Sequence, residues 1–119
     1  MYSPIGGDWQ QNPLCDSVKA IAKGSYKNKT RDQIQSSGYV MHTLEAALWG
    51  FYNSDNFKTG ALDVVNLGDD ADSVGAVYGQ IAGAYYGEMK LPVKWIIKLW
   101  YRHVFYLKAD ELLENGYKA

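Results

Sequence analysis

Apolar residues recur at intervals of three and four along much of this chain, the spacing at which side chains share one face of a helix. The clearest case spans about residues 38–52, where the apolar positions are Val40, Met41, Leu44, Ala47, Leu48 and Phe51. No segment shows convincing two-residue alternation, and the turns lack the dipeptides typical of β-hairpins. The pattern therefore predicts an all-α fold, a compact helical bundle.

Weaker helical signals lie on either side of this segment. Asp16 or Ser17 could cap a short helix, and residues 24–37 are polar enough to form a loop with at most one helical turn. Ser54 and Asp55 resemble a helix start, and Gly68 resembles a helix end. The expected apolar stripe between them is Phe57, Ala61, Leu62, Val64 and Val65.

The C-terminal part predicts two more helices. The first has Val74, Val77, Ile81 and Tyr85 as its apolar positions. Pro92 suits the first turn of a last long helix. The apolar stripe of that helix includes Trp95, Ile96, Leu99, Trp100 and Val104. Residues 1–15 are rich in Gly, Pro and Asn and are expected to be irregular, while residues 1–119 together have the size of a single domain.

Four glycines recur at every fourth position, at Gly75, Gly79, Gly83 and Gly87. Each glycine inside a helix costs about 0.8–1 kcal/mol relative to alanine. Close approach of another helix is the simplest compensation, because a missing Cβ lets two backbones meet. The stripe therefore predicts tight packing against another helix, and residues 38–52 are the expected partner.

Composition and charge argue against a nucleic-acid-binding protein, a secreted protein and a membrane protein. The formal net charge is −1, which argues against a nucleic-acid binder held by a broad basic surface. The single cysteine, Cys15, cannot form an intramolecular disulfide and suits a reducing compartment, so we expect a cytoplasmic protein. The N-terminus lacks the basic and apolar regions of a signal peptide. No window has 18 uncharged apolar residues, so no membrane helix is predicted.

The acidic stretch before the glycine stripe is the main candidate for chemistry. Asp69, Asp70, Asp72 and Ser73 sit where a helix is expected to begin. One carboxylate there could cap the free N–H groups of the first turn. Three carboxylates so close together repel one another, and a hard divalent cation such as magnesium or calcium would neutralise them. From spacing alone, both the cap and the metal site stay open.

Other polar residues carry weaker signals. His42 and His103 lie on expected helices without a second histidine one turn away, so they are interpreted as surface or packing residues. Glu45 lies in the middle of an apolar helix and is interpreted as a structural acid that pairs with a buried donor. Cys15 has no basic neighbour in sequence that would favour a nucleophile.

Three stretches in order resemble a known family. GYVMHTLEAALWGF (38–51), VVNLGDDADSVGAVYGQIAGAYYG (64–87) and LPVKW (91–95) resemble the C-terminal part of the ADP-ribosylglycohydrolase family. The resemblance implies an all-helical fold with two magnesium or manganese ions in a central cleft. It places metal ligands on Asp70, Asp72 and Ser73, where the family usually has threonine at the last position. It also places an ADP-ribose contact on Tyr39, and makes Asp69 an exposed or supporting acid.

The family's other metal ligands come from a Thr-Asp-Asp motif near the N-terminus of a protein more than twice this length. No such motif occurs in these 119 residues. The chain therefore resembles a C-terminal half, as a fragment, a split gene product or a degenerate relative. Its catalytic acid and base are expected in the part that is missing.

Two functions follow from the resemblance. The first is a metal-dependent hydrolase that cleaves the ribose glycosidic bond of ADP-ribosylated acceptors, with this chain carrying half of the metal site. The alternative is a non-catalytic remnant that binds ADP-ribose or metal, or has a structural role. The implied partners are an ADP-ribosylated protein or small molecule, and either a complementary N-terminal polypeptide or a second copy of the chain.

Overall fold

A computed structural model describes residues 14–118. The described residues form helices and no strands, which confirms the all-α class. Helix α1 spans Asp16–Ala22, α2 Val40–Tyr52, α3 Phe57–Val65, α4 Ala71–Tyr86, α5 Val93–Lys98 and α6 Arg102–Lys118. Three short 3₁₀ turns, η1 (Ser25–Asn28), η2 (Arg31–Gln33) and η3 (Glu88–Lys90), lie between them. The expected irregular segment 1–15 falls mostly outside the described residues.

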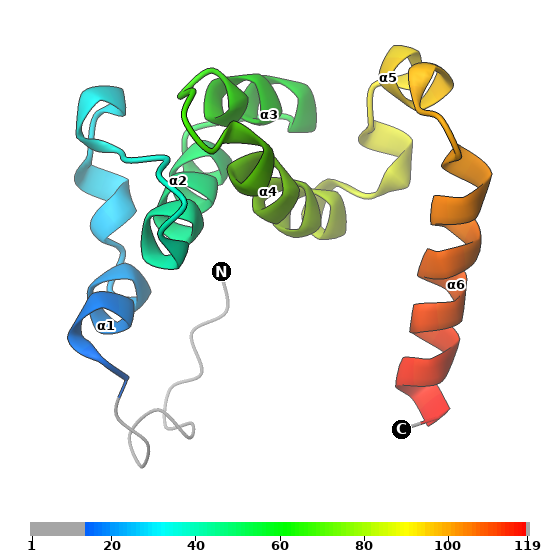
Figure 1. Cartoon of the computed structure of the whole chain (residues 1–119), viewed down its shortest axis with the longest axis horizontal. Coiled ribbons are helices and arrows are strands. Elements are labelled where there is room, and N and C mark those ends of the chain that lie inside the picture. Colours follow the sequence, from blue (N-terminus) through cyan, green and yellow to red (C-terminus); the bar gives the residue numbers. More distant parts are fainter. Residues whose placement is uncertain (1–13, 119) are drawn as a thin grey trace.

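The core forms where α2, α3 and α4 pack together (Figure 1). Its fully buried side chains are Ala46, Ala47, Val64, Val74, Tyr78 and Ala82. Small residues on α2 let α3 and α4 approach closely. At Gly50 a Cβ would overlap Cγ1 of Val64, so glycine is required at that crossing. Tyr78 lies against Gly60 of α3 and donates a hydrogen bond from its hydroxyl to the Phe57 carbonyl at 2.9 Å.

The buried face of α4 differs from the predicted one. Val74, Tyr78 and Ala82 are buried, whereas Tyr85 is 72% exposed. Val77 and Ile81 are only partly buried against the core. The two rows of residues have the same four-residue spacing, so periodicity alone could not choose between them.

The prediction for the glycine stripe is wrong. A Cβ on Gly79 or Gly83 would meet nothing within 4 Å, and the same holds for Gly87. Gly75 does lie close to another element, but its neighbour is Val65 of α3, at 3.2 Å from the added Cβ, and not residues 38–52. The stripe faces away from the core because the adjacent row on α4 carries the contacts with α2 and α3.

Two predicted helix starts and the last helix also need correction. Helix α1 begins after Cys15, so Asp16 lies inside its first turn. Helix α3 begins after Asn56, whose side chain accepts a hydrogen bond from the Thr59 backbone N–H at 2.9 Å and so replaces the expected start at Ser54. The predicted last helix is two helices, since the chain is extended at Leu99 and left-handed at Tyr101, with φ of 58°.

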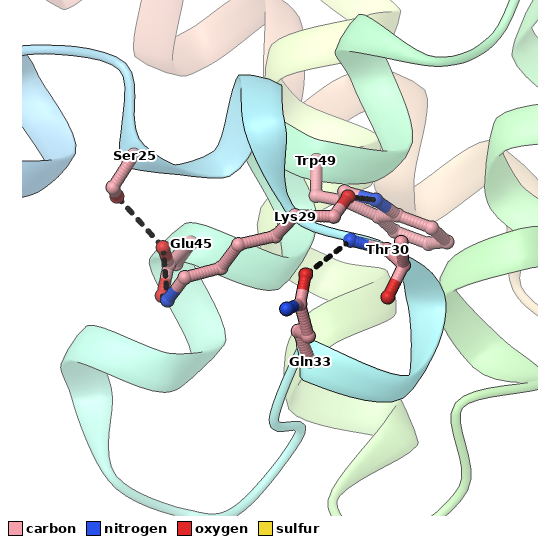
Figure 2. Close-up of polar contacts among 6 residues, drawn as sticks. All are labelled: Ser25, Lys29, Thr30, Gln33, Glu45 and Trp49. Carbon is pink, nitrogen blue, oxygen red and sulfur yellow. Dashed lines mark hydrogen bonds and ion pairs between the residues drawn. The ribbon is translucent and has the colours of Figure 1, made fainter.

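A polar network holds the segment before α2 against that helix (Figure 2). Glu45 accepts hydrogen bonds from Ser25 at 2.7 Å and from Lys29 at 3.0 Å. Trp49 donates from its indole to the Lys29 carbonyl at 3.1 Å. Burial raises the pKa of Glu45, but the bonds from Lys29 and Ser25 outweigh this and hold it below the ordinary 4.5. These contacts confirm Glu45 as a structural acid.

Candidate functional site

The acidic stretch forms the turn from α3 into α4. Gly68 and Asp69 both have positive φ, at 79° and 53°, and turn the chain sharply before Asp70. Aspartate tolerates this left-handed conformation better than most residues. Asp69 is exposed, as expected of an acid outside the ligand set, while Asp70 and Ser73 are half-buried and Asp72 is exposed. Asp70 stands at the N-cap position of α4 but makes no side-chain capping bond.

Asp70 and Asp72 lie two residues apart where α4 begins. The pKa of the Asp72 carboxyl is lowered first by a hydrogen bond with Asp70, and then by the backbone N–H groups of Ser73 and of Asp72 itself. The free N–H groups at the start of α4 thus favour negative charge at this point. Asp70 thus stands at the N-cap of α4, and Asp72 and Ser73 lie in its first turn.

A buried serine from another part of the chain holds the acidic turn in place. Ser36 donates from its hydroxyl to the Gly68 carbonyl at 2.9 Å, and its own carbonyl accepts from the Asp70 N–H at 2.9 Å. A Cβ on Gly38 would lie 3.5 Å from Oδ2 of Asp70. Sequence reasoning missed Ser36, and nothing in the local pattern marks a serine that binds a turn more than thirty residues away.

Tyr39 follows directly on this loop and occupies the N-cap position of α2. Its ring is 54% exposed and stands edge-on to His42, with centroids 5.0 Å apart. Ser37 fixes His42, since its hydroxyl lies 2.7 Å from Nδ1 of that ring. The loop 36–39 therefore brings Tyr39 and the acidic pair to the same region. His42 packs on Tyr39.

A hollow of about 220 Å³ opens beside Tyr39, between α1, η1 and α2. Its polar lining includes His42, Lys29 and Glu45, while Met41 and Ile21 supply apolar surface. Three of its polar lining residues are bonded to one another, since Glu45 accepts hydrogen bonds from Lys29 and Ser25.

The donor set of the acidic turn is small. Within residues 14–118, no three His, Cys, Asp or Glu side chains gather into a group that could hold a metal ion. Asp70, Asp72 and Ser73 together offer two carboxylates and one hydroxyl, which are hard oxygen donors suited to magnesium or manganese. Their chemistry fits such an ion, but a complete ligand set needs further donors.

Comparison with known proteins then decides the family. Residues 5–119 match the model of the ADP-ribosylglycohydrolase family. The chain belongs to the ADP-ribosylglycohydrolase family. The match covers both the acidic turn and Tyr39, so the features that first suggested the family lie inside the matched region.

Individual relatives agree with the family match. The chain is 54% identical to the ADP-ribosylarginine hydrolase Tri1 of Pseudomonas putida over 98% of its own length, and 56% identical to the Tri1 hydrolase of Serratia proteamaculans over 73%. It is 42% identical to the ADP-ribosyl-[dinitrogen reductase] glycohydrolase of Rhodospirillum rubrum over 55%. The chain spans only 33%, 24% and 22% of these relatives' lengths. No helix within the described residues is long and apolar enough to cross a membrane.

Proposed function

We propose that this chain is part of a metal-dependent ADP-ribosyl hydrolase that releases ADP-ribose from the arginine of an ADP-ribosylated protein. The arginine acceptor comes from the two Tri1 relatives, which are named as ADP-ribosylarginine hydrolases. In this proposal Asp70, Asp72 and Ser73 supply part of the metal site, and Tyr39 contacts ADP-ribose. The catalytic acid and base come from the part of the family fold that this chain does not span.

The position of Asp70 and Asp72, two residues apart at the start of α4, carries the metal proposal. Two ionised carboxylates at the start of one helix repel each other, and a divalent cation bound by both would relieve that repulsion. Magnesium usually keeps several waters and is held by one or two carboxylates. A magnesium or manganese ion therefore suits this pair, with the Ser73 hydroxyl as a further oxygen donor.

The reaction needs water to add to the anomeric carbon of the ribose while the bond to the guanidine nitrogen breaks. Bound metal ions would orient the ribose hydroxyls and polarise the reacting centre. The residues of this chain hold the acidic turn and Tyr39 at a fixed separation. The loop 36–39 does this, because Ser36 bonds the acidic turn while Tyr39 presents an exposed aromatic ring.

Metal binding tests the first part of the proposal. Mn²⁺ binding to the purified chain can be measured by electron paramagnetic resonance, with Asp70→Asn and Asp72→Asn as site variants. Asp69→Asn is the matched control, because it removes the same charge from the same turn and keeps a residue that tolerates positive φ. The site variants should weaken Mn²⁺ binding by roughly tenfold or more, since each removes a ligand oxygen's charge. Equal affinities in all the variants would reject a metal site at these residues.

Turnover tests the second part. The isolated chain should not release ADP-ribose from an ADP-ribosylated arginine peptide with Mg²⁺, because a two-metal mechanism needs both ions fixed. Adding the part of the Pseudomonas putida relative that lies outside the matched third should restore release, and Asp70→Asn should abolish it again. Robust turnover by the chain alone would show that its site is already complete.

We also propose a cytoplasmic location. The support is the single cysteine in the sequence, Cys15, whose free thiol suits a reducing compartment. Fractionation of the native cells, followed by immunodetection of the chain, tests it directly.

A further inference from the structure

Helix α6 is amphipathic, and within residues 14–118 no helix buries its apolar side. Five residues recur at the spacing of one helical face and are named here the α6 apolar face: Phe105, Ala109, Leu112, Leu113 and Gly116. The opposite side carries charged residues, among them Glu111, Glu114 and Lys118. Leu107 lies on that charged side, about 140° around the helix from Leu112 at 100° per residue.

The α6 apolar face is exposed to solvent. Helix α6 has no buried residue, and Figure 1 shows it apart from the helices α1–α4. Leu112 is 74% exposed and Leu113 60% exposed. An amphipathic helix in a globular protein normally turns its apolar stripe towards a core. An exposed apolar helix face is typical of a site of contact with another polypeptide.

We propose that the α6 apolar face docks against the part of the ADP-ribosylglycohydrolase fold that this chain does not span. The family match runs through residue 119, so α6 belongs to the family fold and is not an appended tail. The Pseudomonas putida relative matches 98% of this chain, but the match takes up only 33% of that relative. The remaining two thirds are therefore available to cover this face.

The acidic turn points to the same occupant. It supplies two carboxylates and a hydroxyl, and the metal site in the proposed function needs further ligands from elsewhere. A second copy of the chain could cover the α6 apolar face, but it would bring only the same donors. This argument from missing metal ligands rests on the proposed function. The exposure of α6 and the family match do not depend on metal binding or catalysis.

The test uses one pair of matched variants on the full chain. Leu112→Glu places a charge on the α6 apolar face, and Leu107→Glu places the same charge on the other side of the same helix. Both leucines are exposed, at 74% and 61%, so neither change should alter the folded chain, which circular dichroism can check. The probe is the part of the Pseudomonas putida hydrolase outside the matched third, co-expressed with the chain and without substrate or added metal.

The wild-type chain and the Leu107→Glu variant should each form a one-to-one complex with the probe and keep the probe soluble. Light scattering measures the mass of this complex. Leu112→Glu should weaken the complex by ~100-fold or more, since a charge buried in an apolar contact is costly. Equal binding by the two variants, or no complex with any of them, would overturn the proposal. So would a homodimer of the chain that Leu112→Glu alone dissociates. Complex formation without catalytic rescue would sustain the docking and count against the proposed function.

Discussion

Alanine at Gly50 and alanine at Gly79 should change stability in opposite directions, although both glycines lie in helices. The difference comes from what a new Cβ would meet. At Gly50 it would overlap Cγ1 of Val64, which is fully buried and has no free space to move into. At Gly79 it would meet nothing within 4 Å.

The magnitudes follow from two terms. Replacing a helical glycine by alanine gains about 0.8–1 kcal/mol from backbone entropy. At Gly79 this gain is nearly the whole effect, so the free energy of unfolding should rise by ~0.4–1 kcal/mol. At Gly50 the overlap adds an overpacking cost of about 1–3 kcal/mol, at the upper end because Val64 is β-branched and enclosed. The net loss there should be about 2 kcal/mol.

Urea unfolding of the wild type and both variants, followed by circular dichroism, measures the two changes. The midpoint should fall for Gly50→Ala and rise for Gly79→Ala, with the slope unchanged. A neutral Gly50→Ala would refute close packing of α2 on α3. A destabilising Gly79→Ala would show that the glycine stripe is packed after all, as the sequence alone suggested.

Three further predictions concern single interactions. Tyr78→Phe should lower the free energy of unfolding by about 0.5–1.5 kcal/mol, because the hydrogen bond to the Phe57 carbonyl is lost, and urea unfolding at pH 7 measures this. The pKa of Glu45 is below 4.5 in the folded chain, so the contribution of its bonds to Lys29 is present above about pH 4.5 and is lost as the pH falls through the lower folded value. The stability difference between wild type and Glu45→Gln should therefore shrink between pH 6 and pH 3, and a constant difference would contradict the lowered pKa. The pKa of the Asp72 carboxyl lies below its ordinary value, so the Mn²⁺ affinity of the wild type should fall only when the pH drops below about 4. Asp72→Asn should remove this fall in affinity at low pH. An unchanged dependence of Mn²⁺ affinity on pH would exclude Asp72 as the titrating ligand.

The sequence by itself determined the all-α class, the position of α2 and the start of α4. Helix α2 was predicted at about 38–52 and spans Val40–Tyr52, because its apolar residues repeat with the helical period over several turns. The acidic turn was expected at a helix start, and α4 begins directly after Asp70. These features are local, so the residues that encode them are neighbours in the chain. The family resemblance rested on the same local motifs, and the family match confirmed it.

Only the tertiary structure decided which faces are buried and which distant residues meet. On α4 the row Val74, Tyr78 and Ala82 and the row Gly75, Gly79 and Gly83 have the same spacing. Burial then depends on where α2 and α3 lie, and a pattern along one helix carries no information about that. The break at Tyr101 has no glycine or proline to mark it, so the periodic pattern ran through it. The bonds of Ser36 to the acidic turn join residues far apart in sequence, and such contacts arise only when the packed helices bring the two loops together.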